Sequence, residues 1–368
     1  MASSLPTPST SQPGSPTSRA GLTAWVPTPL HPDALELART YFDVIDPTDA
    51  RAETWYDFAD AAIVTAGKLS TPHVERAASA RLRIVTRNGA LVSLCAVHWS
   101  PLTDVEEWVD AGVGTDSIPL ETCRAHAIAV TNQPGCNAQA VAELALGLAI
   151  AVSRKLAQVD RTLTAGRRTI SAEWRAPTVQ GKTLGLVGMG DIARETAKKF
   201  HGAFDTPVVV YSPTSPELRW TNQDSSGLVP IPHRRVDTLD ELLAVSDIVS
   251  LHCPLNDRTR GIIGEREFGL MKSSAIILNT ARGGLIDEPA LARALRARTI
   301  YGAGIDTLEH EPPTLERYPE LLSLENILVM PHIGAQEEDS QRKACIVAVE
   351  TAYSYLTGRG IGQSKRVV

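Results

Sequence analysis

The chain has 368 residues, of which 43% are hydrophobic and 21% charged, values typical of a globular protein long enough for two domains. Its formal net charge of -6 argues against nucleic acid as the main partner, because nucleic-acid-binding proteins usually present a basic face. We find no run of about 18 uncharged apolar residues, so we expect no membrane span and no membrane partner. The five cysteines include no CxxC pair, which favours reduced thiols in a cytoplasmic protein and no metal site.

The first segment, residues 1–21, is dominated by Ser, Pro and Thr. A segment of this composition buries too little apolar surface to fold, and it lacks the apolar core of a secretory signal. We predict a disordered tail ahead of the first domain.

Short apolar runs alternate with polar, alanine-rich runs in the first third of the chain. The strand-like runs lie at 42–46, 61–65 and 82–86, and the stretch 72–80 has a helical composition. Alternation of strands and helices predicts a parallel sheet with helices on both faces. We assign residues 22–133 to this domain.

A longer series of the same kind follows a strongly apolar helix, predicted from Asn137 to about Val159 with Asn137 as its N-cap. The expected strands lie at 184–188, 207–211, 247–252, 275–280 and 326–331. Five strand-like runs with helical runs between them describe one complete doubly wound domain, which we assign to residues 134–334. A last helix is expected over Glu337–Leu356.

The segment LGLVGMGDIARETAKKF places glycines where an apolar strand gives way to a helix. Gly188 permits a tight turn, Gly190 lets the backbone approach a pyrophosphate, and Ala193 lets the helix pack closely on the strand. Asp191 and Ile192 begin the helix, whose free N–H groups and positive dipole end favour phosphate. Because the glycines have a strand before them and a helix after them, we predict a dinucleotide-binding site here.

The cofactor can be NAD or NADP. The second strand of such a unit usually ends in a carboxylate that binds the ribose hydroxyls of NAD, but here the strand ends at Tyr211 and Ser212 follows. A serine does not repel a 2′-phosphate as a carboxylate would, which favours NADP. The nearest downstream cation is Arg219, a candidate for that phosphate.

Titratable residues follow three later apolar runs. Arg282 follows AIILNTA, Asp306 and Glu311 follow YGAGI, and His332 follows NILVMP. Parallel sheets collect their sites at the carboxyl ends of strands. An arginine can pair with a carboxylate, a histidine can exchange a proton, and a glutamate can stabilise the charged imidazole. These are the groups that a 2-oxo acid reductase needs.

From roughly residue 42 to residue 356 the sequence resembles the D-isomer-specific 2-hydroxyacid dehydrogenase family. The resemblance rests on AGVGTDSIPLE, VTNQPGCNAQAVAELALGL, GKTLGLVGMG, LHCPLNDRTRGII, LNTARGGLIDEPALARAL, GIDTLEHEPP and MPHIG. It implies an α/β fold with two Rossmann-like domains: a flavodoxin-like substrate domain, completed by residues 335–368, and an inserted doubly wound NAD(P)-binding domain.

The resemblance also implies residue roles. Arg282 matches the substrate-carboxylate arginine, Glu311 the partner of the histidine, and His332 the general acid/base of hydride transfer at C2 of a small 2-oxo or D-2-hydroxy acid. The implied cofactor contacts, beyond the glycine turn and Ser212, are His252, Pro254, Thr280, Ala281, Asp306 and Gly334. The implied substrate contacts, beyond Arg282, are Lys68, Gly112, Val113 and Gly114.

One segment departs from the family pattern. Residues 90–110, ALVSLCAVHWSPLTDVEEWVD, stand between a predicted strand and the glycine loop that is expected to bind substrate. They are either a genuine insertion that acts as a lid or a translated, unspliced intron. Val92-Ser93 can be encoded by the splice-donor sequence GTGAGT and Leu102-Thr103 by the branch-point sequence CTGAC, which favours the intron.

The sequence leaves alternatives open. Within the enzyme class, the rival is a phosphoglycerate dehydrogenase, which shares this core. From other classes, the rivals are a corepressor on the same fold that binds NAD(H) as a ligand, and an inactive product of the retained intron. The family resemblance also implies a homodimer, with an arm near RTISAEWRAP and Trp174 as a possible anchor.

Overall fold

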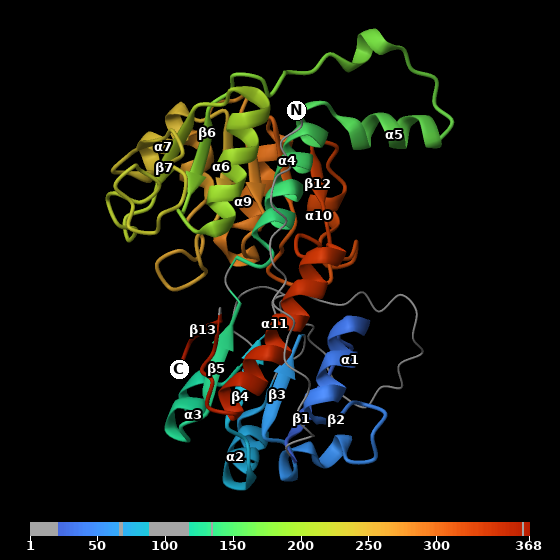
Figure 1. Cartoon of the computed structure of the whole chain (residues 1–368). Coiled ribbons are helices and arrows are strands. Elements are labelled where there is room, and N and C mark those ends of the chain that lie inside the picture. The colour runs from blue at the N-terminus through green and yellow to red at the C-terminus, as the bar shows by residue number, and fades with distance from the viewer. Residues whose placement is uncertain (1–20, 66–68, 88–117, 134, 363) are drawn as a thin grey trace, which may run out of the picture.

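A computed structural model describes residues 21–65, 69–87, 118–133, 135–362 and 364–368. They form two lobes, each built around its own sheet, and one long helix runs from the upper lobe into the lower one (Figure 1). The strands of the lower sheet come from both ends of the chain, whereas those of the upper sheet come from its middle.

The lower sheet has six strands in the order β13-β5-β4-β3-β1-β2. The strands are β1 (Thr23–Trp25), β2 (Asp43–Ile45), β3 (Ala61–Val64), β4 (Ile84–Arg87), β5 (Ala129–Asn132) and β13 (Lys365–Arg366). β1 to β5 pair in parallel, and β13 joins β5 antiparallel. Read from the other edge, the parallel strands have the order 2-1-3-4-5, which is the flavodoxin-like order that we expected.

Helices cover both faces of this sheet. The helical elements are α1 (Pro32–Tyr41), η1 (Ala52–Asp57), α2 (Thr71–Ala80), α3 (Leu120–Ala125) and α11 (Glu338–Leu356). α1 and α11 bury one face, in a cluster that includes Ala38 and Ala348, and η1, α2 and α3 bury the other. Burial on both faces explains why β3, in the middle of the sheet, is continuously apolar rather than alternating.

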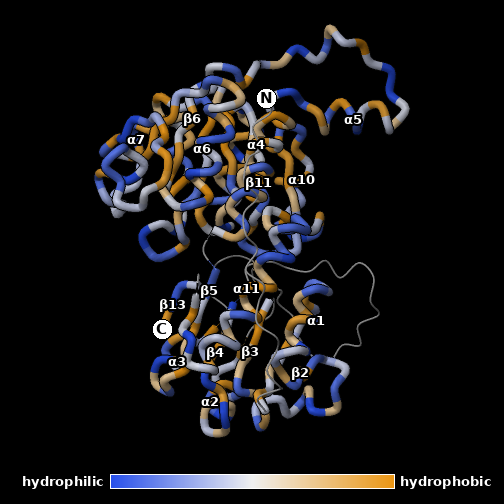
Figure 2. Tube along the Cα trace, viewed as in Figure 1, coloured by the Kyte–Doolittle hydropathy of each residue, from blue (hydrophilic) through white to orange (hydrophobic). Residues whose placement is uncertain are grey.

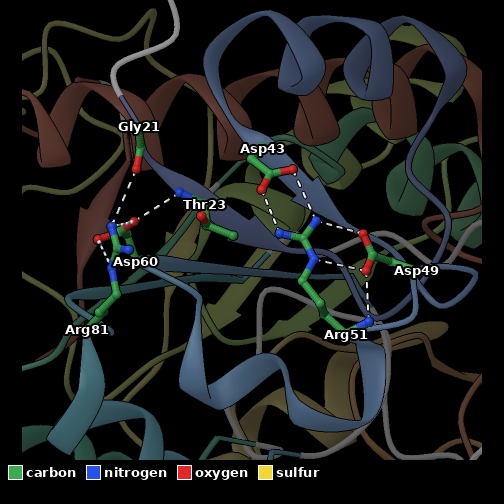
Figure 3. Close-up of polar contacts among 7 residues, drawn as sticks. All are labelled: Gly21, Thr23, Asp43, Asp49, Arg51, Asp60 and Arg81. Carbon is green, nitrogen blue, oxygen red and sulfur yellow. Dashed lines mark hydrogen bonds and ion pairs between the residues drawn. The ribbon is translucent and has the colours of Figure 1, made fainter.

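Charged side chains, of which Asp60 is buried, hold the amino ends of the lower strands (Figure 3). Asp60, just before β3, accepts the N–H of Thr23 at 2.9 Å and contacts the guanidinium groups of Arg81 and Arg83. Next to it, Arg51 bridges the carboxylates of Asp43 and Asp49. These ion pairs and hydrogen bonds lie at the edge of the sheet opposite to the carboxyl ends of its parallel strands.

The upper sheet has seven strands in the order β12-β11-β10-β9-β6-β7-β8. They are β6 (Leu184–Val187), β7 (Val208–Tyr211), β8 (Arg234–Arg235), β9 (Ile248–Leu251), β10 (Ile276–Asn279), β11 (Gly302–Ile305) and β12 (Ile327–Val329). Every pairing is parallel. This is the doubly wound order, and it reverses between β6 and β9, where such folds bind ligands.

Two layers of helices enclose the upper sheet. α4 (Ala138–Ser153) and α6 (Asp191–Phe204) cover one face. The helices α7 (Leu239–Val245), α8 (Glu265–Leu270), α9 (Glu288–Arg296) and α10 (Pro319–Leu322) cover the other. The short helices η2 (Ser171–Trp174) and η3 (Gly283–Leu285) lie in loops. In the parts of the chain that the structure describes, every helix is too short or too polar to cross a membrane.

The prediction of one helix from Asn137 to Val159 was wrong. α4 ends at Ser153, Lys155 takes a left-handed conformation with φ 55°, and a separate helix α5 (Leu156–Thr164) begins. The break falls in the polar triplet Ser153-Arg154-Lys155, which the prediction treated as part of one continuous helix. Asn137 does occupy the N-cap position, but its side chain makes no capping hydrogen bond.

Several strands were not predicted. β1, β5, β8 and β13 are only two to four residues long. β13 reads Lys-Arg, without any apolar signal, because pairing with β5 rather than burial makes it a strand. The last helix was predicted correctly, and Glu337 caps it by accepting N–H groups from Asp339 and Ser340.

Candidate active site

The register of the upper sheet brings several strand ends to one edge. Val187 of β6 pairs with Tyr211 of β7 and Leu251 of β9, so Gly188, Ser212 and His252 all follow at the same edge. The same alignment continues through β10, β11 and β12, because Asn279 pairs with Leu251 and Ile305. The residues predicted from separate motifs therefore leave the sheet on one side.

Gly188 is required by close packing at the switch point. It has φ 112°, and a Cβ at this position would lie 2.6 Å from the carbonyl oxygen of His252. Its N–H donates to the Tyr211 carbonyl at 2.9 Å, and the His252 N–H donates to the Val187 carbonyl at 2.8 Å. These bonds fix the turn between β6 and α6.

Gly190 has the opposite environment. It is the N-cap of the 14-residue helix α6, and a Cβ built on it would meet nothing within 4 Å. An open backbone at the start of a long helix fits a pyrophosphate, which the helix N–H groups and dipole attract. Asp191 is exposed and Ile192 half-buried on the first turn, while Ala193 is fully buried beneath them.

The end of β7 carries serines and arginines. Ser212 is buried, and its Oγ lies 2.8 Å from Oγ of Ser215. Arg235 holds this loop by donating to the carbonyl of Ser212 at 2.7 Å. Arg219 reaches back over the glycine turn, where its Nη2 lies 3.9 Å from a carboxylate oxygen of Asp191.

His252 lies half-buried in the loop that follows β9. Burial lowers its pKa to about 3, and its Nε2 lies 2.9 Å from Oγ of Ser250. Pro254 follows on the exposed part of the same loop, and its carbonyl accepts a hydrogen bond from the Thr259 hydroxyl at 2.6 Å. The loop that we expected to cross the cofactor is thus well ordered by its own side chains.

Asn279 shapes the turn that follows β10. Its Oδ1 accepts the N–H of Ala281 at 3.1 Å, and its Nδ2 donates to the carbonyl of Arg282 at 2.7 Å. Arg282 is half-buried, and its Nη1 donates to the Ala281 carbonyl at 2.7 Å. Thr280 Oγ1 is buried and has no hydrogen-bond partner among the described residues, as expected of a hydroxyl that meets a ligand.

His332 and Glu311 form a pair. Nδ1 of His332 lies 2.9 Å from a carboxylate oxygen of Glu311, with side-chain exposures of 11% and 19%. A carboxylate at this distance favours the protonated imidazole and fixes the orientation of the ring. The two residues were predicted from separate motifs, and the fold brings them into contact.

Asp306 holds the backbone of His332. Its two oxygens accept the N–H groups of Ile333 at 2.8 Å and Gly334 at 2.9 Å, and its carbonyl accepts the N–H of His332 at 2.8 Å. These bonds stabilise the left-handed conformation of His332, which has φ 58°. Asp306 is only 1% exposed, and burial raises its pKa. Gly334 is needed because a Cβ there would lie 2.8 Å from the carboxylate.

The arginine segment and the histidine pair touch through Gly283. A Cβ on Gly283 would overlap the peptide between Leu308 and Glu309. The residue next to Arg282 therefore supports the segment that leads to Glu311. Four of the predicted substrate residues, Lys68, Gly112, Val113 and Gly114, and the segment 90–110 lie outside the described residues.

Sequence reasoning missed the residues that support this site. Asn279, Ser250 and Arg235 each fix a loop through hydrogen bonds to backbone or to another side chain. Asn279 ends a strand just before Thr280 and Ala281, and this position was its only signal. Within the described ranges, no three His, Cys, Asp or Glu side chains gather to hold a metal ion.

A glycine turn at the switch point of a doubly wound sheet defines a dinucleotide-binding α/β protein. The sequence profile of the D-isomer specific 2-hydroxyacid dehydrogenase NAD binding domain matches residues 146–334. The chain therefore belongs to the D-isomer-specific 2-hydroxyacid dehydrogenase family, and it is an NAD(P)-dependent oxidoreductase that transfers hydride on 2-hydroxy and 2-oxo acids.

Individual relatives agree with this assignment. The chain is 41% identical to a hydroxypyruvate reductase of Thermotoga maritima over 246 residues, which is 67% of this chain and 76% of that protein. It is 33% identical to a D-3-phosphoglycerate dehydrogenase of Methanocaldococcus jannaschii over 90% of this chain but only 56% of that protein. A glyoxylate reductase structure from Paecilomyes thermophila aligns with a TM-score of 0.72 at 26% identity, covering 94% of this chain and 98% of that one.

Proposed function

We propose that the protein reduces a small 2-oxo acid, or oxidises the matching D-2-hydroxy acid, with His332, Glu311 and Arg282 as its catalytic residues. The observation that carries the proposal is the 2.9 Å contact between Nδ1 of His332 and Glu311, at the edge where the glycine turn also lies. We further propose that residues 22–133 and 335–368 form the substrate domain and that residues 134–334 form the cofactor domain.

The residues divide the work as follows. When bound, NAD(P)H supplies the hydride for C2 of the 2-oxo acid. His332 gives its proton to the developing alkoxide at C2, and Glu311 stabilises the imidazolium before that transfer. The guanidinium of Arg282 pairs with the substrate carboxylate, which sets the orientation of the carbonyl. In the reverse direction His332 accepts the hydroxyl proton.

The test is to replace each group and to measure binding separately from turnover. His332→Ala is expected to lower kcat by at least about 100-fold, the range for loss of a general acid, and to leave the Kd of NAD(P)H unchanged. Arg282→Ala is expected to raise the KM of the acid as well, because the carboxylate loses its partner. Full activity of His332→Ala would refute the role of His332 as the general acid.

The substrate and the rival readings are separated by one screen. We propose glyoxylate or hydroxypyruvate as the 2-oxo acid, in line with the names of the relatives, and turnover of 3-phosphoglycerate instead would favour a phosphoglycerate dehydrogenase. A protein that binds NAD(H) but turns over none of these acids would fit the corepressor reading. Running the screen with and without residues 90–110 tests the retained intron, since activity gained on deletion would support it.

We propose NADP(H) as the preferred cofactor. Ser212 stands where a carboxylate would select NAD, and Arg219 lies against the same turn and offers a guanidinium for a 2′-phosphate. The probe is 2′,5′-ADP, which carries that phosphate without the nicotinamide. It should bind at least tenfold more tightly than 5′-AMP, and Ser212→Asp should abolish the difference. Equal binding of the two nucleotides would contradict the preference.

We propose that the protein is a homodimer that buries α5 against a second copy. α5 and the segment after it stand away from the upper lobe (Figure 1). None of the residues of α5 is buried, and apolar and polar residues alternate along its trace (Figure 2). Leu156, Leu163 and Ile170 are 51%, 56% and 56% exposed. An amphipathic helix with a bare apolar side is stable only when that side is covered.

A further inference from the structure

The segment Leu308–Glu311 determines where the carboxylate of Glu311 points. One oxygen of Glu311 faces His332, and the other accepts the N–H of Leu308 at 3.2 Å, a long hydrogen bond. This bond ties the Glu311 carboxylate to the backbone of its own segment. The orientation of the Glu311 carboxylate therefore depends on the contacts that fix the backbone of residues 308–310.

Glu288 and Tyr318 hold that backbone. Glu288, in the first turn of α9, accepts the N–H of Glu309 at 2.6 Å. Tyr318, the N-cap residue of α10, accepts the N–H of His310 at 2.8 Å with its hydroxyl oxygen. The two side chains lie close together, and burial and the nearby carboxylate of Glu288 together raise the pKa of Tyr318 to about 12; we call the pair the Glu288–Tyr318 clamp. They bind the two residues that come directly before Glu311.

The other side of the segment is closed. Gly283 packs against the Leu308–Glu309 peptide so tightly that no side chain would fit. Tyr318 is 8% exposed and belongs to the apolar core of the upper lobe, as does Leu308. The segment therefore lies between the turn that carries Arg282 and the Glu288–Tyr318 clamp.

We propose that Glu288 and Tyr318 are positioning residues that keep Glu311 against His332, which they do by binding the backbone N–H groups of Glu309 and His310. The inference rests on the proposed function, because it assigns a purpose to the Glu311–His332 contact. Neither residue touches the reacting atoms. Removing either side chain of the clamp should lower the pKa of His332 and kcat, although it removes no group that contacts substrate or cofactor.

Titratable groups lie on both sides of the segment. Glu288 faces Glu309, His310 and Tyr318, and burial raises its pKa. His332 faces Glu311 and Asp306. Of these groups, Glu311 is the one whose distance from the imidazole depends on the clamp, since Asp306 is tied to the backbone of residues 332–334.

The test compares Glu288→Ala with Glu288→Gln, whose amide oxygen can still accept the Glu309 N–H. Glu288→Ala should lower kcat by about 10- to 100-fold, as expected of a misplaced catalytic group, and leave the KM of NAD(P)H unchanged. The pKa of His332, followed by NMR titration and assigned with His332→Asn, should fall because the carboxylate moves away. Glu288→Gln should keep both values near those of the wild type.

Matched variants distinguish a specific effect of the clamp on Glu311 from a general loss of protein stability. Arg260→Gln removes an exposed ion pair with the side chain of Glu309 and should change neither value. Tyr318→Phe keeps the ring in the core and removes only the hydroxyl, so it serves if Glu288→Ala fails to fold. In a Glu311→Gln background, Glu288→Ala should have no further effect on kcat.

The outcomes are distinguishable. An unchanged His332 pKa in both Glu288→Ala and Tyr318→Phe would overturn the inference, as would a Glu288→Gln protein as impaired as Glu288→Ala. The NMR titration does not require an active enzyme. A wild type that reduces no 2-oxo acid would contradict the proposed function. The His332 pKa values would still show whether Glu288 and Tyr318 position Glu311.

Discussion

Gly188 and Gly190 stand two positions apart in one turn and are glycines for different reasons. At Gly188 a side chain would collide with the His252 backbone, whereas at Gly190 it would meet no atom of the described residues within 4 Å. The first glycine is thus needed by the fold, and the second is expected to be needed by the ligand.

Substitution by alanine should separate these two requirements. Gly188→Ala is expected to destabilise the protein by about 2 kcal/mol or more, because it combines a positive φ with a backbone clash. Gly190→Ala should leave the melting temperature unchanged and weaken NAD(P)H binding. Thermal melts and a fluorescence titration of NADPH check both, and a loss of stability in Gly190→Ala would contradict the distinction.

The half-buried imidazole of His252 is expected to make stability depend on pH. Its pKa falls from 6.5 to about 3 on folding, so below pH 6.5 the unfolded state takes up a proton that the folded state refuses. The stability gained from burying the neutral ring is fully present above pH 6.5 and is lost as the pH falls toward 3. Urea midpoints should therefore drop between pH 7 and pH 5, and His252→Gln should make that drop shallower. If His252→Gln showed the same pH dependence as the wild type, His252 would not be the group responsible for the drop.

At this scale, the sequence predicted residues whose motif is local. Gly188 was found because a strand, a turn and a helix follow one another in the chain. Glu288 and Tyr318 could not be found in this way, because their partners are backbone N–H groups of a distant segment. The Glu311–His332 contact is intermediate. Both residues were predicted from the sequence, but only the structure gives the distance between them.

At the scale of elements, Asp60 ties the start of β3 to β1 and to the end of α2 (Figure 3). Its side chain is 5% exposed, while Arg81 and Arg83 are 47% and 50% exposed. A buried carboxylate that has several donors contributes more than a surface pair, but half-exposed arginines reduce its value.

Asp60→Ala is therefore expected to lower the free energy of unfolding by about 2 to 3 kcal/mol. The matched control is Asp57→Ala, which breaks an exposed pair with Arg76 and should cost less than about 1 kcal/mol. Urea denaturation of both variants checks the difference, and equal effects would show that burial of Asp60 does not matter.

Element boundaries also show where sequence patterns fail. The break between α4 and α5 is a change of backbone conformation at Lys155, in the polar triplet 153–155, and the prediction extended one helix across it. β13 has no apolar residue, so nothing in its sequence distinguishes it from a loop. The four-residue apolar strands β6, β7, β9 and β10 were predicted, because burial on both faces leaves a continuous hydrophobic run.

At the scale of the whole molecule, the strand orders of both sheets agree with the predicted fold class. Alternation of strands and helices implies right-handed parallel crossovers, which limits the possible orders, and the resemblance to a family selected among them. The oligomeric state could not be derived in this way, since it depends on a surface whose partner lies outside the chain.

The proposed homodimer gives a test at this scale. Leu156→Asp and Leu163→Asp place charge on the bare side of α5 and should convert the protein to a monomer in size-exclusion chromatography with light scattering. Leu315, which is 69% exposed on the loop before α10, provides the control, because Leu315→Asp should leave the mass unchanged. A monomeric wild type would refute the proposal.

The lower lobe draws its parts from both ends of the chain, and this has a consequence for biosynthesis. Its core needs Cys345, Ala348 and Val349 of α11 against α1, and its sheet needs β13 at residues 365–366. The upper sheet is complete once residue 329 has left the ribosome. The nascent chain must therefore carry an unfinished first lobe through most of translation, and the lobe that begins later in the sequence is the first that can reach its native state.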